Sequence, residues 1–194
     1  MREELVRIGG RILDHFGTGN DDPPFTVYQY LPDQEWQVRA DLGALRSWLE
    51  APGREVTCAA ISLSRLMWTA LDESGFADEL VAQELMACAD PEMMAEIYDS
   101  LGEILRNPPT LPERVVAAVE GFPPRTAVFL YQAGALYPAY RTSTLLDDLR
   151  GGLPRPVTLL YPGRLVGDYG LSFMDRAEPS YGYRAAIVPR ESRA

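Results

Sequence analysis

Two kinds of apolar pattern alternate along this chain. Short, nearly continuous runs of aromatic, β-branched and other apolar residues predict strands, because turn residues and charges bound each run. Continuous runs of this kind are typical of parallel strands, whose two faces are both covered by helices. Five strands are predicted, at residues 25–31, 56–63, 126–131, 156–161 and 183–188. Two glycine- or proline-containing pairs, Gly151-Gly152 and Pro162-Gly163, are predicted to be turns.

Between these runs, apolar residues recur at intervals of three and four, which predicts amphipathic helices. Two helix starts carry strong signals: Asp90-Pro91 combines an N-cap with proline, and Thr110 with Glu113 forms a capping box. We expect Asp33 and Ser64 to cap two further helices. The predicted helices cover residues 3–16, 33–49, 64–71, 76–89, 91–105, 111–119 and 142–150.

This order of elements predicts an α/β fold with an open, mostly parallel sheet of about five strands and helices on both faces. The expected topology is Rossmann-like or P-loop-NTPase-like, without a P-loop. We expect residues 1–194 to form a single α/β domain, with a helical insertion at about 64–121. Ligands of such sheets meet the carboxyl ends of the strands, where the segments Tyr30–Asp33, Gln132–Arg141 and Tyr161–Arg164 are expected.

The residues needed for common α/β enzyme chemistry are missing. All 18 basic residues are arginine, which excludes a P-loop lysine, and no G-x-G-x-x-G follows a predicted strand. We therefore expect no cofactor and no catalytic residue. The only histidine, His15, is expected at a surface or helix end, and Cys58 and Cys88 are expected to be small core residues, so no metal site is predicted.

Two pairs of neighbouring carboxylates, Asp21-Asp22 and Asp147-Asp148, are a weaker signal. Vicinal acids can share a hard cation or take part in acid/base chemistry. One pair falls in a predicted loop and the other near a helix end, so we favour solvated charges for both.

Charge and aromatic residues are unevenly distributed. The net charge is −10 overall, with −13 on residues 1–124 and +3 on residues 125–194, and the latter segment holds seven of the ten tyrosines. Tyrosine and arginine together are enriched at protein interfaces, although a single tyrosine in a strand is usually a packing residue. The negative charge argues against direct nucleic-acid binding. No apolar run of about 20 residues and no signal peptide is visible, so a cytoplasmic protein without membrane contact is expected.

The candidate interface or anion site lies in this C-terminal third. Arg141 follows a predicted strand, where it could hold a carboxylate or phosphate, or form a structural salt bridge. Ser143 and Thr144 begin the next helix, where their hydroxyls could bind an anion or simply cap the helix. The candidate residues are Tyr137, Arg141, Ser143, Thr144, Tyr161, Arg164, Tyr183 and Arg184.

Several blocks of this sequence resemble the BrxB family of BREX phage-defence systems. The blocks are residues 128–138, Arg141 with Leu145-Leu146 and Leu149, 159–163 and 181–185, with further similarity at 24–32, Val38-Arg39 and 61–63. The resemblance implies an accessory component that acts beside a PglZ phosphatase-like protein, a DNA methyltransferase and a large ATPase, with the PglZ-like protein as direct partner. The family commonly has an Arg-Ser-His-like stretch where this chain has Arg141-Thr142-Ser143.

Three functions follow from these observations. The leading hypothesis is a non-catalytic component that binds a PglZ-like protein, and possibly other BREX components, through the tyrosine- and arginine-rich C-terminal third. The first alternative is a degenerate or unrecognised enzyme that binds a phosphorylated ligand or nucleotide at the carboxyl ends of the strands. The second is nucleic-acid contact through the C-terminal arginines.

Overall fold

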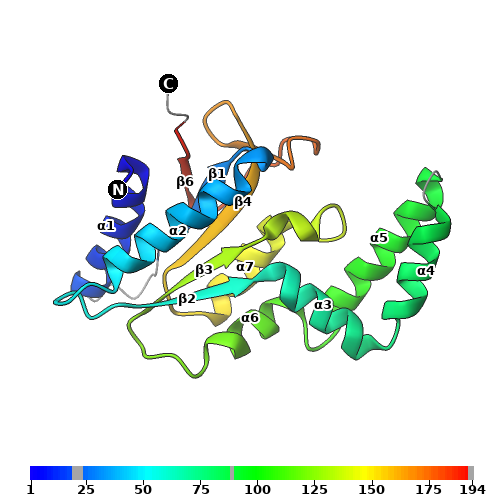
Figure 1. The fold of residues 1–194 in the computed structure, drawn as a ribbon, viewed down its shortest axis with the longest axis horizontal. Coiled ribbons are helices and arrows are strands. Elements are labelled where there is room, and N and C mark those ends of the chain that lie inside the picture. The colour runs from blue at the N-terminus through cyan, green and yellow to red at the C-terminus, as the bar shows by residue number, and fades with distance from the viewer. Residues whose placement is uncertain (19–23, 88–89, 192–194) are drawn as a thin grey trace.

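The computed structural model describes residues 1–18, 24–87 and 90–191 and shows an α/β fold built on an open, six-stranded sheet (Figure 1). The strands are β1 (Phe25–Tyr30), β2 (Thr57–Ser62), β3 (Thr126–Tyr131), β4 (Val157–Val166), β5 (Gly170–Phe173) and β6 (Ala186–Pro189). The helices are α1 (Glu3–Thr18), α2 (Glu35–Leu49), α3 (Leu63–Ser74), α4 (Ala77–Ala87), α5 (Pro91–Arg106), α6 (Leu111–Val119) and α7 (Thr142–Gly152), with short 3-10 turns η1 (Pro32–Gln34) and η2 (Ala133–Leu136). The expected fold class is confirmed.

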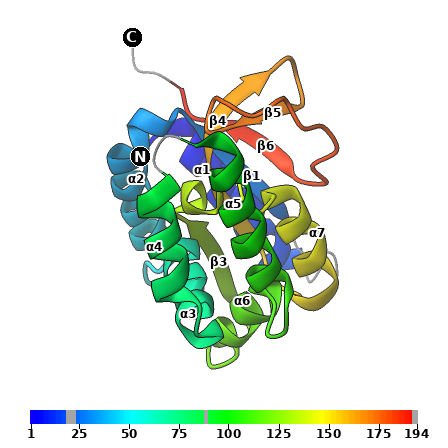
Figure 2. The same cartoon turned by 90° about the vertical axis from the view of Figure 1, so that its right-hand side faces the viewer.

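The sheet runs in the order β2-β3-β4-β1-β6, and all neighbouring strands in this order are parallel. This order differs from the 3-2-1-4-5-6 order of dinucleotide-binding folds. Helices α1 and α2 cover one face of the sheet, and α3, α6 and α7 cover the other (Figure 2). Apolar side chains of each group join a separate buried cluster with the strands. All six residues of β1 are buried, as expected for a strand covered on both sides.

Five strands were predicted, and β5 is the additional one. The predicted turn at Pro162-Gly163 is wrong. Both residues lie inside β4, which continues past the parallel part of the sheet and pairs antiparallel with β5. Proline has no N–H to donate, but it is tolerated there because its carbonyl makes the hydrogen bond. The Pro162 carbonyl accepts from the Met174 amide at 2.9 Å. The last strand also starts later than predicted, at Ala186.

Two predicted helix caps are wrong by one or two residues. Ser62, and not Ser64, caps α3, because its hydroxyl accepts a hydrogen bond from the Arg65 amide at 3.0 Å. Asp33 lies within η1, so α2 begins after Gln34 instead. The predicted caps Asp90 and Thr110 are confirmed by hydrogen bonds to the first amides of α5 and α6.

Helices α3 to α6 all come between β2 and β3 in the sequence. The α4–α5 pair projects away from the sheet (Figure 1). Leu80, Ala87 and Ile97 of this pair form a small core with Leu71 of α3. Several large apolar side chains on this pair remain exposed, among them Val81, Met86 and Met93. In the described part of the chain, no helix is long and apolar enough to span a membrane.

A close contact between α1 and α2 depends on a glycine. A Cβ atom added at Gly9 would overlap the ring of Trp48 and would come within 3.2 Å of Leu45 Cδ1. The adjacent Gly10 has no other atom within 4 Å of such a Cβ. Gly9 therefore permits the helix approach, whereas Gly10 only weakens the helix.

We expect Gly10→Ala to raise the free energy of unfolding by about 0.5–1 kcal/mol, because alanine loses less backbone entropy than glycine in a helix. Gly9→Ala should lower it by about 1–3 kcal/mol, because the methyl group overpacks the Trp48 contact. Urea unfolding followed by circular dichroism measures both. Equal stabilisation by the two alanines would contradict the close approach of α1 and α2.

Candidate functional site

A pocket of about 420 Å³ lies beside the N-terminus of α7. We call it the α7 pocket. It is lined by Tyr137, Pro138, Tyr140, Arg141, Thr142, Ser143, Tyr161, Leu171, Phe173, Ala177, Glu178, Pro179, Ser180 and Tyr183. Five of the eight candidate residues are thus brought together: Tyr137, Arg141, Ser143, Tyr161 and Tyr183.

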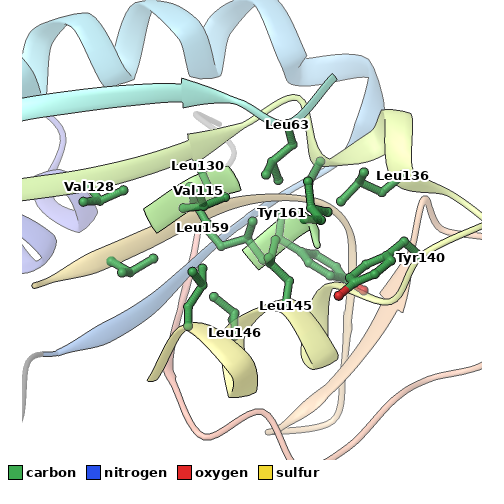
Figure 3. Close-up of a cluster of buried hydrophobic side chains, with 14 of the residues drawn as sticks. Leu63, Val115, Val128, Leu130, Leu136, Tyr140, Leu145, Leu146, Leu159 and Tyr161 are labelled. Atoms are coloured by element: carbon green, nitrogen blue, oxygen red, sulfur yellow. The ribbon is translucent and has the colours of Figure 1, made fainter. Parts of the chain in front are cut away.

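Aromatic rings form one side of this pocket. The ring centroids of Tyr161 and Phe173 are 5.3 Å apart, and Tyr137 meets Phe173 edge-on at 5.5 Å. Tyr183 meets Tyr161 edge-on at 5.9 Å. Tyr140 and Tyr161 belong to the same buried cluster as Leu145 and the core strands (Figure 3). Rings packed in this way form a rigid, apolar wall.

The position of Tyr161 is fixed by its strand. In the register of the parallel ladder, Tyr161 of β4 lies opposite Gln29 of β1. Two residues later, a Cβ atom at Gly163 would collide with the Ser172 carbonyl and would lie 2.6 Å from Tyr161 Cε1. Gln29 Nε2 donates to the Gly163 carbonyl at 2.7 Å. The absence of a side chain at Gly163 therefore allows β5 to close over the Tyr161 ring.

The Tyr161 side chain is fully buried, yet its hydroxyl has no hydrogen-bond partner among the described residues. The neighbouring Tyr183 hydroxyl is instead 3.0 Å from Thr142 Oγ1. Burial, with a smaller contribution from Tyr183, raises the pKa of Tyr161 well above its usual range. The hydroxyl therefore stays protonated and keeps a hydrogen to donate.

The N-terminus of α7 is not capped by a side chain. Arg141 occupies the cap position, and the Thr142 hydroxyl is engaged with Tyr183. Ser143 and Thr144 lie inside the first turn, so the expected alternative that they cap the helix is wrong. Within residues 1–18, 24–87 and 90–191, no acceptor is found for the Ser143 and Thr144 amides, and Arg141 makes no ion pair. This helix end therefore presents unsatisfied donors and positive charge.

The other three candidate residues lie outside the α7 pocket. Thr144 is exposed on the surface of α7. Arg164 projects from β4 and forms a two-bond ion pair with Asp175, at 2.7 and 2.8 Å, which raises the pKa of Arg164 and lowers that of Asp175. Arg184 lines a different pocket of about 630 Å³, together with His15 and Arg150.

The carboxyl ends of the parallel strands form a third, smaller pocket of about 260 Å³. Pro32, Gln132 and Pro162 line it, so the three segments expected at this edge do meet. The polar side chains here are paired with one another, however. Tyr30 donates to Glu35, which also pairs with Arg39 at 3.4 Å, and Ser62 is 2.5 Å from Gln132.

The remaining predictions on single residues have mixed outcomes. His15 lies in the last turn of α1 and is half-buried. Cys58 is buried, which raises the pKa of its thiol to about 12, whereas Cys88 and Asp21-Asp22 lie outside the described residues. Asp147 and Asp148 are exposed on α7. No three metal-ligating side chains come together in the part of the chain that the structure describes.

Sequence reasoning missed several further residues of the α7 pocket. Phe173 lies on the unpredicted strand β5, and Glu178 and Ser180 follow it. No local pattern marks them, because their place depends on the hairpin that β4 and β5 form. Thr142 could have been found from the sequence, because it is the first residue of the predicted helix beside Arg141.

We expect Tyr161→Phe to raise the free energy of unfolding by about 1 kcal/mol, because it removes a buried hydroxyl that has no partner. Tyr183→Phe also removes a tyrosine hydroxyl. It should lower the free energy of unfolding by about 1 kcal/mol, because it leaves the buried Thr142 hydroxyl unpaired. Chemical unfolding of the two variants provides the comparison. Equal losses in both would mean that the Tyr161 hydroxyl is already hydrogen-bonded.

Comparison with known families identifies the chain. A family model described as BREX protein BrxB matches residues 59–188, which run from within β2 to within β6 and include the whole α7 pocket. No similar curated protein and no similar solved structure was found. Because the match covers more than half of the chain, the chain belongs to the BrxB family and is a component of a BREX phage-defence system.

Proposed function

We propose that this BrxB-family chain acts in its BREX system as a non-catalytic component that binds another protein, with a PglZ-like protein as the partner. The observation that carries the proposal is the exposure of large aromatic side chains around the β4–β5 hairpin. Tyr169 is 73% exposed and Tyr181 is 66% exposed. With the exposed Arg176, these residues define the C-terminal surface.

The exposed tyrosines are held by their backbone. Tyr169 immediately precedes β5, and Tyr181 follows Ser180, which exchanges two 3.0 Å backbone hydrogen bonds with Leu171 of β5. The ring of Tyr181 covers Gly170, where an added Cβ atom would lie 2.8 Å from Tyr181 Cε1. Aromatic side chains held in this way lose little entropy on binding and are common anchors of interfaces.

Charge supports the same surface. Residues 125–194 carry +3, in a chain whose first 124 residues carry −13. Arg141, one of the candidate residues, is exposed as well. An acidic patch on the partner would therefore be repelled less by residues 125–194 than by the acidic first 124 residues.

The non-catalytic part of the proposal rests on the strand ends. In α/β enzymes this edge holds the reacting groups. Here Glu35 and Arg39 pair with each other, and Gln132 is held by Ser62, so these side chains stabilise the fold.

We expect the protein to co-purify with the PglZ-like protein of its own BREX system when the two are co-expressed. Replacing Tyr169 and Tyr181 by alanine should weaken the complex at least about tenfold, because each removes an aromatic anchor. Titration of the purified partners measures the dissociation constant.

A matched variant on the α4–α5 projection serves as the control. Met86→Ser with Met93→Ser also removes two exposed apolar side chains, but from α4 and α5, which project away from the sheet. This variant should bind the partner as the unchanged protein does. Loss of binding in the methionine variant alone would move the interface to the α4–α5 projection, and the absence of any complex would refute the choice of partner.

A further inference from the structure

We infer that the α7 pocket binds a small phosphomonoester whose phosphate is attached to a flat ring, a nucleoside monophosphate being the simplest example. The inference is independent of the proposed partner, since it concerns a concave site and not the exposed tyrosines.

The first support is the donor set at the N-terminus of α7. The amide of Ser143 has no acceptor among the described residues, and Arg141 at the cap position has no acidic partner there. The helix is 11 residues long, so its dipole adds to this positive end. Free amides and an arginine at one helix end bind phosphate oxygens well.

The second support is the Tyr161 hydroxyl, which is independent of the helix. It lies on β4, it is completely buried, and it has no partner in the described part of the protein. A buried polar group of this kind is rare in folded proteins and calls for an explanation. The Tyr183 ring meets Tyr161 edge-on beside this hydroxyl, so a ligand oxygen supplies the missing acceptor once the Tyr183 side chain moves aside.

The shape and lining of the pocket indicate the rest of the ligand. Its volume of about 420 Å³ lies within the range of small-molecule sites. The rings of Tyr137, Phe173 and Tyr183 offer faces and edges for a flat ring. Glu178, on the segment between β5 and β6, disfavours a second anionic group and suits a ring that carries N–H donors.

Two other pockets suit such a ligand less well. At the strand ends, Glu35, Arg39 and Gln132 are already paired within the protein. The pocket around Arg184 includes Thr18 and Pro24, which flank residues outside the described ranges. That pocket also holds two buried nitrogen atoms without a partner among the described residues, His15 Nδ1 and Arg150 Nε. The α7 pocket has its free donors on α7 and β4, beside an aromatic wall and away from the residues outside the described ranges.

The test is titration calorimetry of the full chain with adenosine monophosphate, phenyl phosphate, inorganic phosphate and benzoate. We expect the two ring phosphates to bind more tightly than inorganic phosphate or benzoate. Arg141→Gln and Tyr161→Phe should each weaken the binding of phenyl phosphate about tenfold, because each removes a donor to the anionic group. Tyr161→Phe is also expected to be more stable than the unchanged protein, so a loss of binding cannot come from unfolding.

Arg164→Gln is the matched control, since it removes the same charge outside the pocket. It should leave the binding of phenyl phosphate unchanged. The inference fails if none of the four probes binds at millimolar concentration. It also fails if Arg164→Gln weakens binding as much as Arg141→Gln, which would indicate a general charge effect, or if benzoate binds as tightly as phenyl phosphate, which would make the site a carboxylate site.

Discussion

The fold and the α7 pocket both depend on the pairing of β4. Its first half is parallel to β3 and β1, with Leu159 facing one core and Leu160 the other. A slip of one residue would exchange these side chains between two buried faces, so the register is strongly fixed. The second half of the same strand pairs antiparallel with β5. Tyr161 lies where one pairing gives way to the other, which places its ring at the end of the core (Figure 3).

The elements of the fold could be predicted from sequence where burial makes the pattern continuous or periodic, as in β1, β3 and α5. The prediction failed where a local signal competed with a distant contact. Pro162-Gly163 has the composition of a turn, yet the Ser172 carbonyl needs the open space at Gly163, so the chain stays extended. The α3 cap is Ser62 instead of Ser64 because two serines lie near the same helix start, and local sequence cannot rank them.

The same limit applies to the candidate site. Residues that follow β3 and begin α7 meet at the pocket, since a helix after a parallel strand starts at the carboxyl edge. Arg184 instead precedes β6, whose first residue, Ala186, lies opposite Thr26 near the start of β1, so Arg184 falls at the opposite edge. Arg164 lies beyond the parallel part of β4. The sequence showed that these arginines belong to the C-terminal third of the chain. It did not show at which edge of the sheet each would lie.

A pocket with unsatisfied donors and a surface with exposed tyrosines share one segment of the chain. Ser180 and Tyr183 line the α7 pocket, while Tyr181 between them belongs to the C-terminal surface. Backbone hydrogen bonds tie this segment to β5, so it moves with the β4–β5 hairpin. An occupant of the pocket and a partner on the surface would therefore contact adjacent residues of one short segment. Any effect that one has on the affinity of the other must then be reciprocal, because linkage between two binding sites is symmetric.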